Sequence, residues 1–284
     1  MTTGQSRYAD ISSLINDIYE GAFMTLRQQN LLVPTVSVFS GQGMNPRKNS
    51  TYGAANPRQV AEGEDVTSTQ FNRTALSTLT PYRYADQFFM TDERLATDDQ
   101  NLRADAALEL GGAFAAYVDE SIADQFASLT GGTIGSAGST LLWDEIIKAR
   151  AMMHALKIPG PYFCVLHPYQ WMYLVQSATA TSAEIAGAPQ FQDSLINNYF
   201  VSSLVGGVTF VVTPSIDVDT NADAIGAMYN RQAIAYDERR PFNIRPERDE
   251  SREGVELNAS LWYAVGTWAP TRGIKLVGDA TTPS

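Results

Sequence analysis

Residues Gln59–Glu93 read QVAEGEDVTSTQFNRTALSTLTPYRYADQFFMTDE, and this stretch decides the fold. Its first part is polar and acidic. From Tyr82 to Met90, large apolar side chains recur at every second position, with Asp86 as the single interruption. A period of two is typical of a β-strand that has one apolar face. We therefore predict a long hairpin over residues 52–93, in which two strands of about 15 residues reach roughly 50 Å and end in an acidic tip.

A hairpin of this length needs a surface to lie on. Two strands alone are only marginally stable in water, because they bury little apolar area. If the domain that carries the hairpin supplies no such surface, a neighbouring subunit must supply it. The sequence therefore predicts an assembling protein, and this inference holds without reference to any family.

A strong helical pattern follows the hairpin. Apolar residues recur at helical spacing, which predicts a long helix over Thr97–Leu129. Thr97 and Gln100 fit a capping box at its start. The pair Gly111-Gly112 weakens the middle of the helix and marks a bend or a close contact. The glycine- and serine-rich residues 130–139 then predict a flexible linker.

The remaining chain alternates predicted helices and strands. The sequence LLVPTVSVF at residues 31–39 is strand-like but interrupted by Pro34, and loops are predicted at 41–49 and 178–192. The clearest strand starts at Val255, because apolar and polar residues alternate along it without interruption. Helices are predicted over Tyr8–Phe23, Leu141–Leu156 and from Pro168 onwards, and strands over Tyr162–Leu166, Val208–Val212, Ala224–Tyr229, Val255–Val265 and Arg272–Val277.

The composition is that of a globular protein, with 44% hydrophobic and 18% charged residues among 284. No apolar run approaches the roughly 20 residues of a membrane helix. The residues after Met1 lack a basic start followed by an apolar stretch, so we expect neither a signal peptide nor a membrane partner. The formal net charge of −11 disfavours a protein that wraps nucleic acid, so we expect the chain to face DNA without gripping it.

Few residues are suited to catalysis. The two histidines, His154 and His167, lie at the ends of predicted elements, where an imidazole usually has a structural role. The single cysteine, Cys164, lies in an apolar strand and is expected to pack as a small hydrophobic residue, which suits folding in a cytoplasm. We therefore expect no catalytic residue and no cofactor, and predict that the protein is not an enzyme.

One segment has the spacing of a metal-binding loop. Asp217–Asp223 alternates oxygen-bearing side chains as a calcium loop does. However, Ala222 stands where such a loop requires glycine, and Met228 stands where it requires a bidentate glutamate. We predict a solvated connection and no metal site, with ion binding left as the alternative.

Charged and aromatic residues on the predicted arm and near the closing strand are candidates for contacts between subunits. The run Glu238–Glu253 mixes both signs and suits either an interface laced with ion pairs or a solvated loop. The acids near the hairpin tip lack a surrounding apolar pocket, which favours a solvated tip over an acid/base cluster. The predicted contact residues are Glu62, Glu64, Asp65, Phe71, Arg73, Tyr82, Arg83 and Tyr84 in the extended loop, and Arg239, Arg240, Arg245 and Arg248 in the peripheral region.

The order of these elements resembles a known family. After the hairpin and the long helix come FCVLHPYQWMYL at 163–174, LVGGVTFVVTP at 204–214 and AIGAMYNRQAIAYDER at 224–239, and a long strand closes the succession. This succession, from about Asn30 to Val277, resembles the major capsid protein of tailed bacteriophages, whose fold is named after the Hong Kong phage. No single motif is diagnostic; the ordered series carries the resemblance.

The resemblance implies an α+β capsid fold with a defined division of the chain. It implies an N-terminal arm (1–51), an extended loop that lies over a neighbouring subunit (52–93), a peripheral domain with a spine helix and linker (94–140), an axial domain around the five-fold and quasi-six-fold axes (141–235), and peripheral return strands (236–284). Some relatives form lysine–asparagine crosslinks from the extended loop. Residues 52–93 contain no lysine, so we do not expect that crosslink.

The resemblance also implies a function and partners. The implied protein assembles with itself, as pentamers and hexamers, into an icosahedral shell around double-stranded DNA in the virion. Assembly in the bacterial host cytoplasm is implied, with portal, scaffold and cement proteins as further partners and DNA faced without sequence-specific binding. A fused scaffold is not expected, because only about 50 residues precede the hairpin. Two alternatives are an encapsulin-type cellular compartment on the same fold and an enzyme built on the alternating domain.

Overall fold

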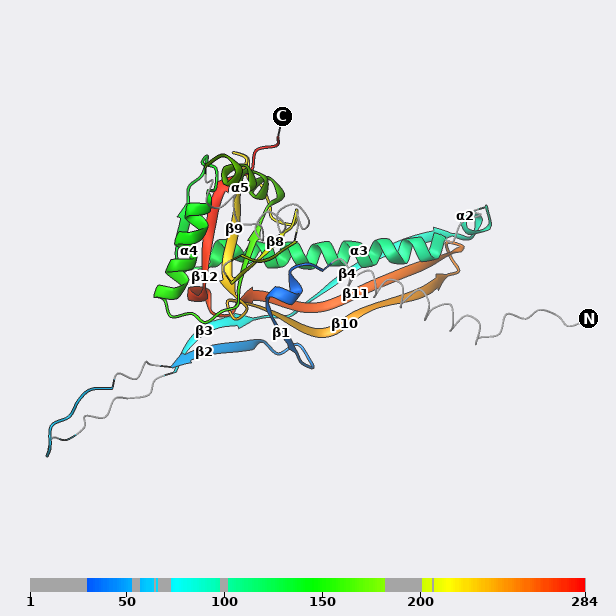
Figure 1. Ribbon diagram of the computed structural model, residues 1–284. Coiled ribbons are helices and arrows are strands. Elements are labelled where there is room, and N and C mark those ends of the chain that lie inside the picture. The colour runs from blue at the N-terminus through cyan, green and yellow to red at the C-terminus, as the bar shows by residue number, and fades with distance from the viewer. Residues whose placement is uncertain are drawn as a thin grey trace, which may run out of the picture.

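Two β-sheets and one long helix organise the chain (Figure 1). The computed structural model describes residues 30–52, 57–63, 65, 73–97, 102–181, 201–205 and 207–283. The helix predicted over Tyr8–Phe23 and most of the loop predicted over 178–192 lie outside these residues. Within the described part of the chain, no helix has the length and apolar character needed to cross a membrane. The predicted α+β class is confirmed.

The first sheet has four strands in the order β1-β10-β11-β4. These are β1 (Ser37–Ser40), β10 (Ile234–Asp249), β11 (Gly254–Thr267) and β4 (Tyr82–Thr91). β10 and β11 form a long antiparallel hairpin, β4 is antiparallel to β11, and β1 is parallel to β10. The predicted strand from Val255 is confirmed as β11, in which buried and half-buried residues alternate. The mixed-charge run from Glu238 is strand β10 over much of its length, which corrects the solvated-loop alternative.

The long helix α3 (Leu102–Ala123) lies along one face of this sheet and continues into the 3-10 helix η2 (Asp124–Ser128). Its apolar side chains share a core with β10 and β11, and the Phe114 ring lies 5.2 Å from the Phe242 ring. Burying a side chain of this size stabilises the fold by about 1.5–3 kcal/mol. The pair Gly111-Gly112 lies within α3 and does not interrupt it.

The start of the long helix differs from the prediction. Thr97 is the last residue of a separate helix, α2 (Asp92–Thr97), and its hydroxyl donates to the carbonyl of Glu93 at 2.9 Å. Thr97 therefore does not open the long helix, and Gln100 lies outside the described residues. The Thr97 hydroxyl, which the capping-box pattern assigned to the start of the long helix, instead hydrogen-bonds a carbonyl in the preceding turn of α2. Threonine forms this type of hydrogen bond readily.

The second sheet has six strands in the order β5-β12-β9-β6-β8-β7. Its strands are β5 (Thr133–Gly135), β12 (Gly273–Asp279), β9 (Asp223–Asn230), β6 (Tyr162–Leu166), β8 (Val208–Val212) and β7 (Val201–Val205). The predictions for β6, β8 and β9 are confirmed. The strand predicted over Arg272–Val277 is confirmed as β12, which pairs with β9 and β5. The flexible linker predicted over residues 130–139 is wrong for β5, which forms a short strand within it.

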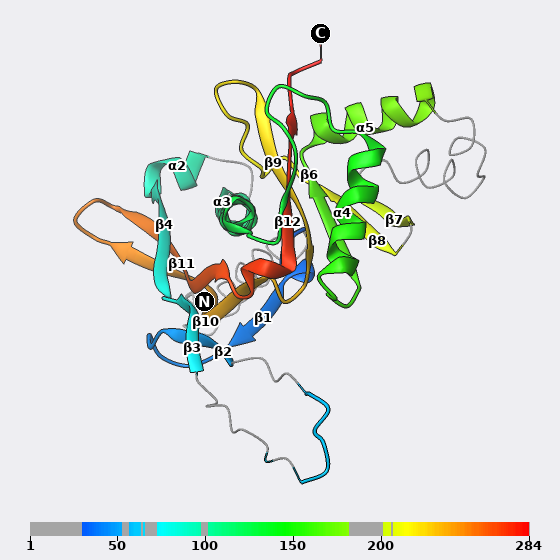
Figure 2. The same cartoon turned by 90° about the vertical axis from the view of Figure 1, so that its left-hand side faces the viewer.

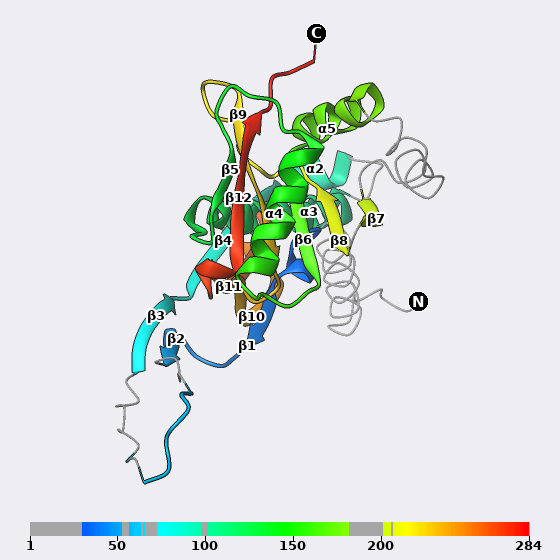
Figure 3. The same ribbon diagram turned by 60° about the vertical axis from the view of Figure 1, so that its left-hand side comes forward.

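Helices α4 (Trp143–Ala155) and α5 (Pro168–Thr181) cover one face of the six-stranded sheet, and both match their predictions closely (Figure 3). Their Trp143 and Trp171 rings both contact Phe210 of β8. The other face joins the core of the first sheet, where the Tyr229 ring lies 5.6 Å from the Phe126 ring. Figure 2 shows α3 end-on between the two sheets, so α3 and η2 connect them into one body.

A two-stranded arm leaves the body near the first sheet (Figures 1 and 2). It pairs β2 (Arg47–Tyr52) with β3 (Arg73–Leu79) in antiparallel register. The hairpin predicted over residues 52–93 is therefore displaced along the chain: it begins inside the predicted loop 41–49 and its second strand ends at Leu79. The following β4 belongs to the body instead, because its apolar face packs on the core beneath α3.

Candidate functional site

The base of the arm is joined to the body by a buried ion-pair cluster. Asp237 of β10 is fully buried and accepts two bonds from Arg47, the first residue of β2, at 3.0 and 3.2 Å. Arg239 donates to the same carboxylate at 2.7 and 3.0 Å. A buried carboxylate without such partners would destabilise the fold by several kcal/mol. The cluster therefore fixes where the arm starts and in which direction it leaves.

A small apolar cluster completes this joint. Leu79, at the end of β3, packs with Ala235 and Ala264 of the first sheet. Phe39 and Trp268 cover them, with their ring centroids 5.0 Å apart. Both strands of the arm are thus anchored at the body, which is required because two strands have little stability of their own.

The arm beyond this joint carries the predicted acidic tip. Glu62 and Asp65 are exposed, and the Arg58 side chain donates to the Asp65 carbonyl at 3.4 Å. Glu64 and Phe71, also predicted as contact residues, lie outside the described residues. Arg73 donates to the Ser50 hydroxyl across the arm at 2.7 Å, so it stabilises the hairpin itself.

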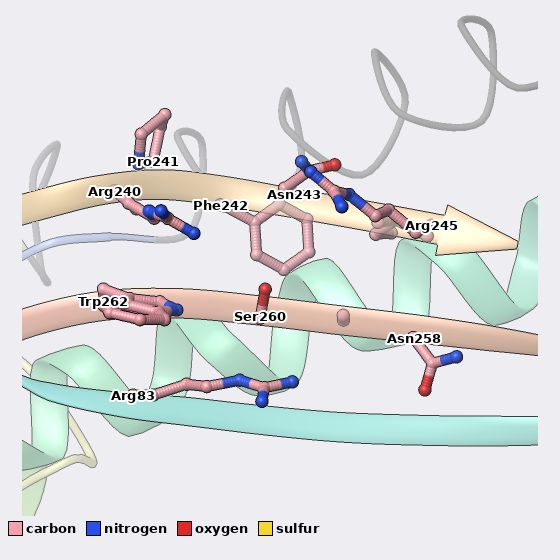
Figure 4. Close-up of a pocket in the computed structure, with 11 residues that line it drawn as sticks. Arg83, Arg240, Pro241, Phe242, Asn243, Arg245, Asn258, Ser260 and Trp262 are labelled. Atoms are coloured by element: carbon pink, nitrogen blue, oxygen red, sulfur yellow. The ribbon is translucent and has the colours of Figure 1, made fainter.

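The face of the four-stranded sheet that points away from α3 carries a hollow of about 740 Å³. Its main side chains, shown in Figure 4, define what we call the arginine hollow: Arg83, Arg240, Arg245, Asn258, Ser260 and Trp262. The strand register accounts for this grouping. Arg240 pairs with Trp262, which in turn pairs with Arg83, and Arg245 pairs with Asn258 two rows further along the same face. Side chains opposite one another in neighbouring strands share one face of the sheet.

The remaining predicted contact residues have different surroundings. Tyr82 is 60% exposed, whereas Tyr84 is stacked on Tyr263 with centroids 4.4 Å apart and belongs to the core side of β4. Arg248 forms a bidentate pair with Asp92 at 2.7 and 3.1 Å. Arg239 is only 7% exposed and is paired with Asp237 inside the subunit, so its contact with another subunit stays a prediction.

A second buried acid, which the sequence did not single out, holds the start of the described chain. The Asp119 carboxylate of α3 accepts the N–H groups of Leu31 and Leu32 at 2.8 and 3.2 Å, just before the 3-10 helix η1 (Val33–Thr35). Burial raises the pKa of Asp119 to about 6. Its position four residues after the buried Ala115 was the available signal, since it places an acid on the apolar face of the helix.

The structure gives the other titratable candidates structural roles. The Asp219 carboxylate accepts the N–H groups of Asn221 and Asp223, as in a turn rather than an ion site. Among the described residues, no three His, Cys, Asp or Glu side chains are grouped to hold a metal. His167 accepts the Tyr169 N–H, and burial lowers its pKa. Cys164 is buried in β6 as predicted, and burial raises its pKa.

Comparison with solved structures shows the fold. The chain is similar to the Mycobacterium phage Che8 structure, at a TM-score of 0.67 and 18% identity over 83% of this chain and 85% of that one. It is similar to the capsid of Helicobacter pylori bacteriophage KHP30, at 0.69 and 10% over 87% and 88%. It is also similar to the virus-like particle from Pyrococcus furiosus, at 0.60 and 12% over 93% and 99%. These likenesses confirm the predicted capsid fold.

Comparison of sequences gives the family. No curated protein matches the chain. The family model described as phage capsid protein matches residues 75–276, which run from within β3 into β12 and include α3, the arginine hollow and every strand of the two large sheets except β1. This match spans well over half of the chain. The chain belongs to the phage capsid protein family.

Proposed function

We propose that this capsid protein is the major capsid protein of a tailed bacteriophage, and that copies of it assemble as pentamers and hexamers into an icosahedral shell around double-stranded DNA. The family match over residues 75–276 is the observation that carries the proposal. The role is structural rather than enzymatic in this proposal, because the matching family is one of capsid proteins.

The arm supports a role in assembly. It is a two-stranded sheet, β2-β3, whose strands pair with no other strand in the described part of the chain, and Figure 1 shows it reaching beyond the body. Such a ribbon is marginally stable in water, so a surface on another subunit is its natural support. In this proposal the six-stranded sheet with α4 and α5 is the axial part, and the four-stranded sheet with α3 is the peripheral part. Repeated symmetric contacts of this kind add up to a closed shell.

The net negative charge of the chain supports the view that the shell does not bind its packaged DNA tightly. At a net charge of −11, the chain repels polyanions on average, so DNA inside the shell is faced without sequence-specific contacts. Portal, scaffold and cement proteins are the further partners in this proposal. The completed shell is the virion capsid, and its assembly takes place in the cytoplasm of the bacterial host.

In this proposal non-covalent contacts hold the shell together, although the arm of the structure contains one lysine. Residues 52–93 have no lysine, but the observed arm begins earlier and includes Lys48 in β2. Lys48 lies at the base of the arm, opposite Thr78, and not at the tip that reaches another subunit. Interface area and arginine–carboxylate pairs are therefore the expected sources of cohesion.

Electron microscopy of the purified protein, alone and with its scaffold, tests the proposal. We expect closed particles tens of nanometres across, and phage-derived particles that protect double-stranded DNA from nuclease. Removing Val60–Asn72 should leave a folded subunit that no longer closes shells. A small species in both preparations would contradict a capsid role. Particles that enclose a protein cargo without DNA would favour the cellular compartment.

A further inference from the structure

A single acid interrupts the core side of β4. Tyr84, Phe88 and Met90 share this side of the strand and pack against the core, because every second side chain of a strand points the same way. Asp86 lies between them and is exposed, although its pairing partner Ala259 on β11 is buried. An apolar side chain at this position would extend the core, so the charge calls for a physical reason.

Asp86 is exposed because a pocket of about 360 Å³ opens between β4 and α3, which Figure 2 shows end-on next to this strand. Tyr263 stacks on one face of the Tyr84 ring at 4.4 Å, and the Tyr117 ring lies 5.3 Å from Tyr84 on the other element. The side chain of Ala113 is too small to fill the space between them. The pocket is lined by Tyr84, Ala85 and Asp86 of β4 and by Ala113, Phe114 and Tyr117 of α3.

Aromatic rings beside a carboxylate favour an organic cation. The faces of tyrosine rings attract ammonium groups and also pack well against methylene groups. An anion would be repelled by Asp86, and Mg²⁺ or Ca²⁺ prefers several carboxylate or carbonyl oxygens where this lining offers one carboxylate. Asp86 forms no ion pair with another described residue, so its charge is free to pair with a ligand.

Further acids continue from the pocket along the exposed side of α3. Glu109 lies four residues before Ala113 and Glu120 lies three residues after Tyr117, and both acids are exposed. At 1.5 Å per residue, each lies about 4.5–6 Å along the helix axis from that pocket residue. Neither acid forms an ion pair with another described residue. An extended chain of four methylene groups separates two ammonium groups by roughly 6 Å, so one ligand can reach Asp86 and one of these acids.

We propose that this pocket binds an aliphatic polyamine. One ammonium group pairs with Asp86 beside the tyrosine rings, the methylene chain lies against the rings, and a second ammonium group pairs with Glu109 or Glu120. A lysine side chain of another protein would offer the first contact but not the second, since it carries a single charge. The net charge of −11 adds a general attraction for such cations. The site is independent of the capsid role, because one subunit contains all of it.

Isothermal titration calorimetry of the purified protein with spermidine tests the site. Hexaamminecobalt(III) is the matched probe, because it carries the same charge as spermidine but has no alkyl chain. At physiological ionic strength, where the general attraction is screened, we expect spermidine to bind at least about tenfold more tightly. Putrescine should likewise bind more tightly than ethylenediamine, whose two charges are too close together to reach two acids.

Two substitutions address the pocket itself. Asp86→Asn should weaken spermidine binding at least about fivefold, because it keeps the shape and removes the charge. Ala113→Leu should weaken binding by a similar factor, since the larger side chain fills the pocket and still suits a helix. Glu93→Gln on α2 is the matched control, because it changes the net charge by the same amount at another exposed acid, and it should leave the affinity unchanged. All three residues are exposed, so circular dichroism should show the fold unaltered.

Equal affinities for spermidine and hexaamminecobalt(III) would overturn the inference, and so would equal affinities of wild type and Asp86→Asn for spermidine. Asp86 would then be a charge that only protects the edge strand β4 from unwanted pairing. A loss in Glu93→Gln as large as that in Asp86→Asn would also overturn it, in favour of a general attraction to an acidic surface. Shell formation is measured separately by microscopy, so a failure here leaves the capsid role intact.

Discussion

Replacing the buried Asp237 with asparagine should weaken both the subunit and the attachment of its arm. The Asp237→Asn side chain keeps the shape but removes the charge that pairs with Arg47 and Arg239. Breaking a buried pair by removing one partner costs about 3–5 kcal/mol. The Arg47 side chain is 30% exposed and can regain water, while Arg239 is only 7% exposed. We therefore expect a loss at the lower end, about 3 kcal/mol in the free energy of unfolding.

Thermal and chemical unfolding of the unassembled subunit measure this loss. For a chain of this size, about 3 kcal/mol corresponds to a melting temperature lower by roughly 6–12 °C. Asp144→Asn is the matched control, because Asp144 pairs with Lys148 on the surface of α4 and both side chains are well exposed. The control should lose less than about 1 kcal/mol.

Particle formation gives an independent readout of the same variant. If the Asp237 cluster directs the arm, Asp237→Asn should form fewer or irregular shells under conditions where the subunit is still folded. Unfolding free energies of Asp237→Asn and Asp144→Asn that agree within experimental error would refute the reasoning about burial. Regular shells from Asp237→Asn at wild-type yield would refute the role of the cluster in directing the arm.

Three further predictions address the core, the linker and the arm. Burial raises the pKa of Asp119 in the folded state to about 6, so the stability that this group contributes is fully present below pH 4 and is lost, by about 3 kcal/mol, as the pH rises through 6. The difference in unfolding free energy between wild type and Asp119→Asn should therefore shrink from pH 4 to pH 7. A difference that stays constant over this range would contradict the raised pKa. In denaturant unfolding, Gly135→Ala should destabilise the subunit more than Gly138→Ala. Both glycines have positive φ, but a Cβ at position 135 would lie 2.0 Å from the Val277 carbonyl oxygen, whereas one at position 138 would meet open space. Equal losses of stability would contradict the close approach of β5 and β12. Lys48→Ala particles and wild-type particles should both dissociate to monomers on a denaturing gel, and a ladder that only wild type shows would reveal a crosslink.

The sequence predicts the elements whose burial follows one regular period. β11 is an example, since Leu257, Ala259 and Leu261 are buried and the residues between them are half-exposed. Likewise, β6 and β8 are short apolar runs between turn signals, and α5 starts at a proline suited to the first helical turn. In these segments the local pattern and the tertiary environment agree, so the pattern is sufficient.

The sequence fails where partners distant in the chain decide the structure. β10 contains Asp237, Arg239 and Arg240, which resemble a solvated run until their partners are known: a carboxylate shared with Arg47 from the arm, and an indole from β11. β5 has three residues in a glycine-rich segment, and its pairing with β12 alone makes it a strand. The hairpin was misplaced for the same reason, because the alternation at Tyr82–Met90 reflects packing on the body rather than on β3.

The sequence predicts the arginine hollow only in part. Arg83, Arg240 and Arg245 were all predicted as contact residues, yet the sequence gives no reason to group them, since Arg83 is more than 150 residues from the other two. Only the register that aligns β4, β11 and β10 brings them together around Trp262. A contact between subunits remains a prediction for each of them.

The position of β12 between β5 and β9 also governs the order in which the subunit can be made. β5 and β9 are synthesised before β12, so β5 has no partner strand and β9 keeps one edge unpaired until Gly273–Asp279 has been added. At about 5–20 residues per second, the interval between β5 and β12 is roughly 7 to 28 s. A chain that stops early cannot complete this sheet, and the exposed edge of β9 makes it a target for proteases. A chain that lacks β12 therefore has no link between β5 and the rest of this sheet.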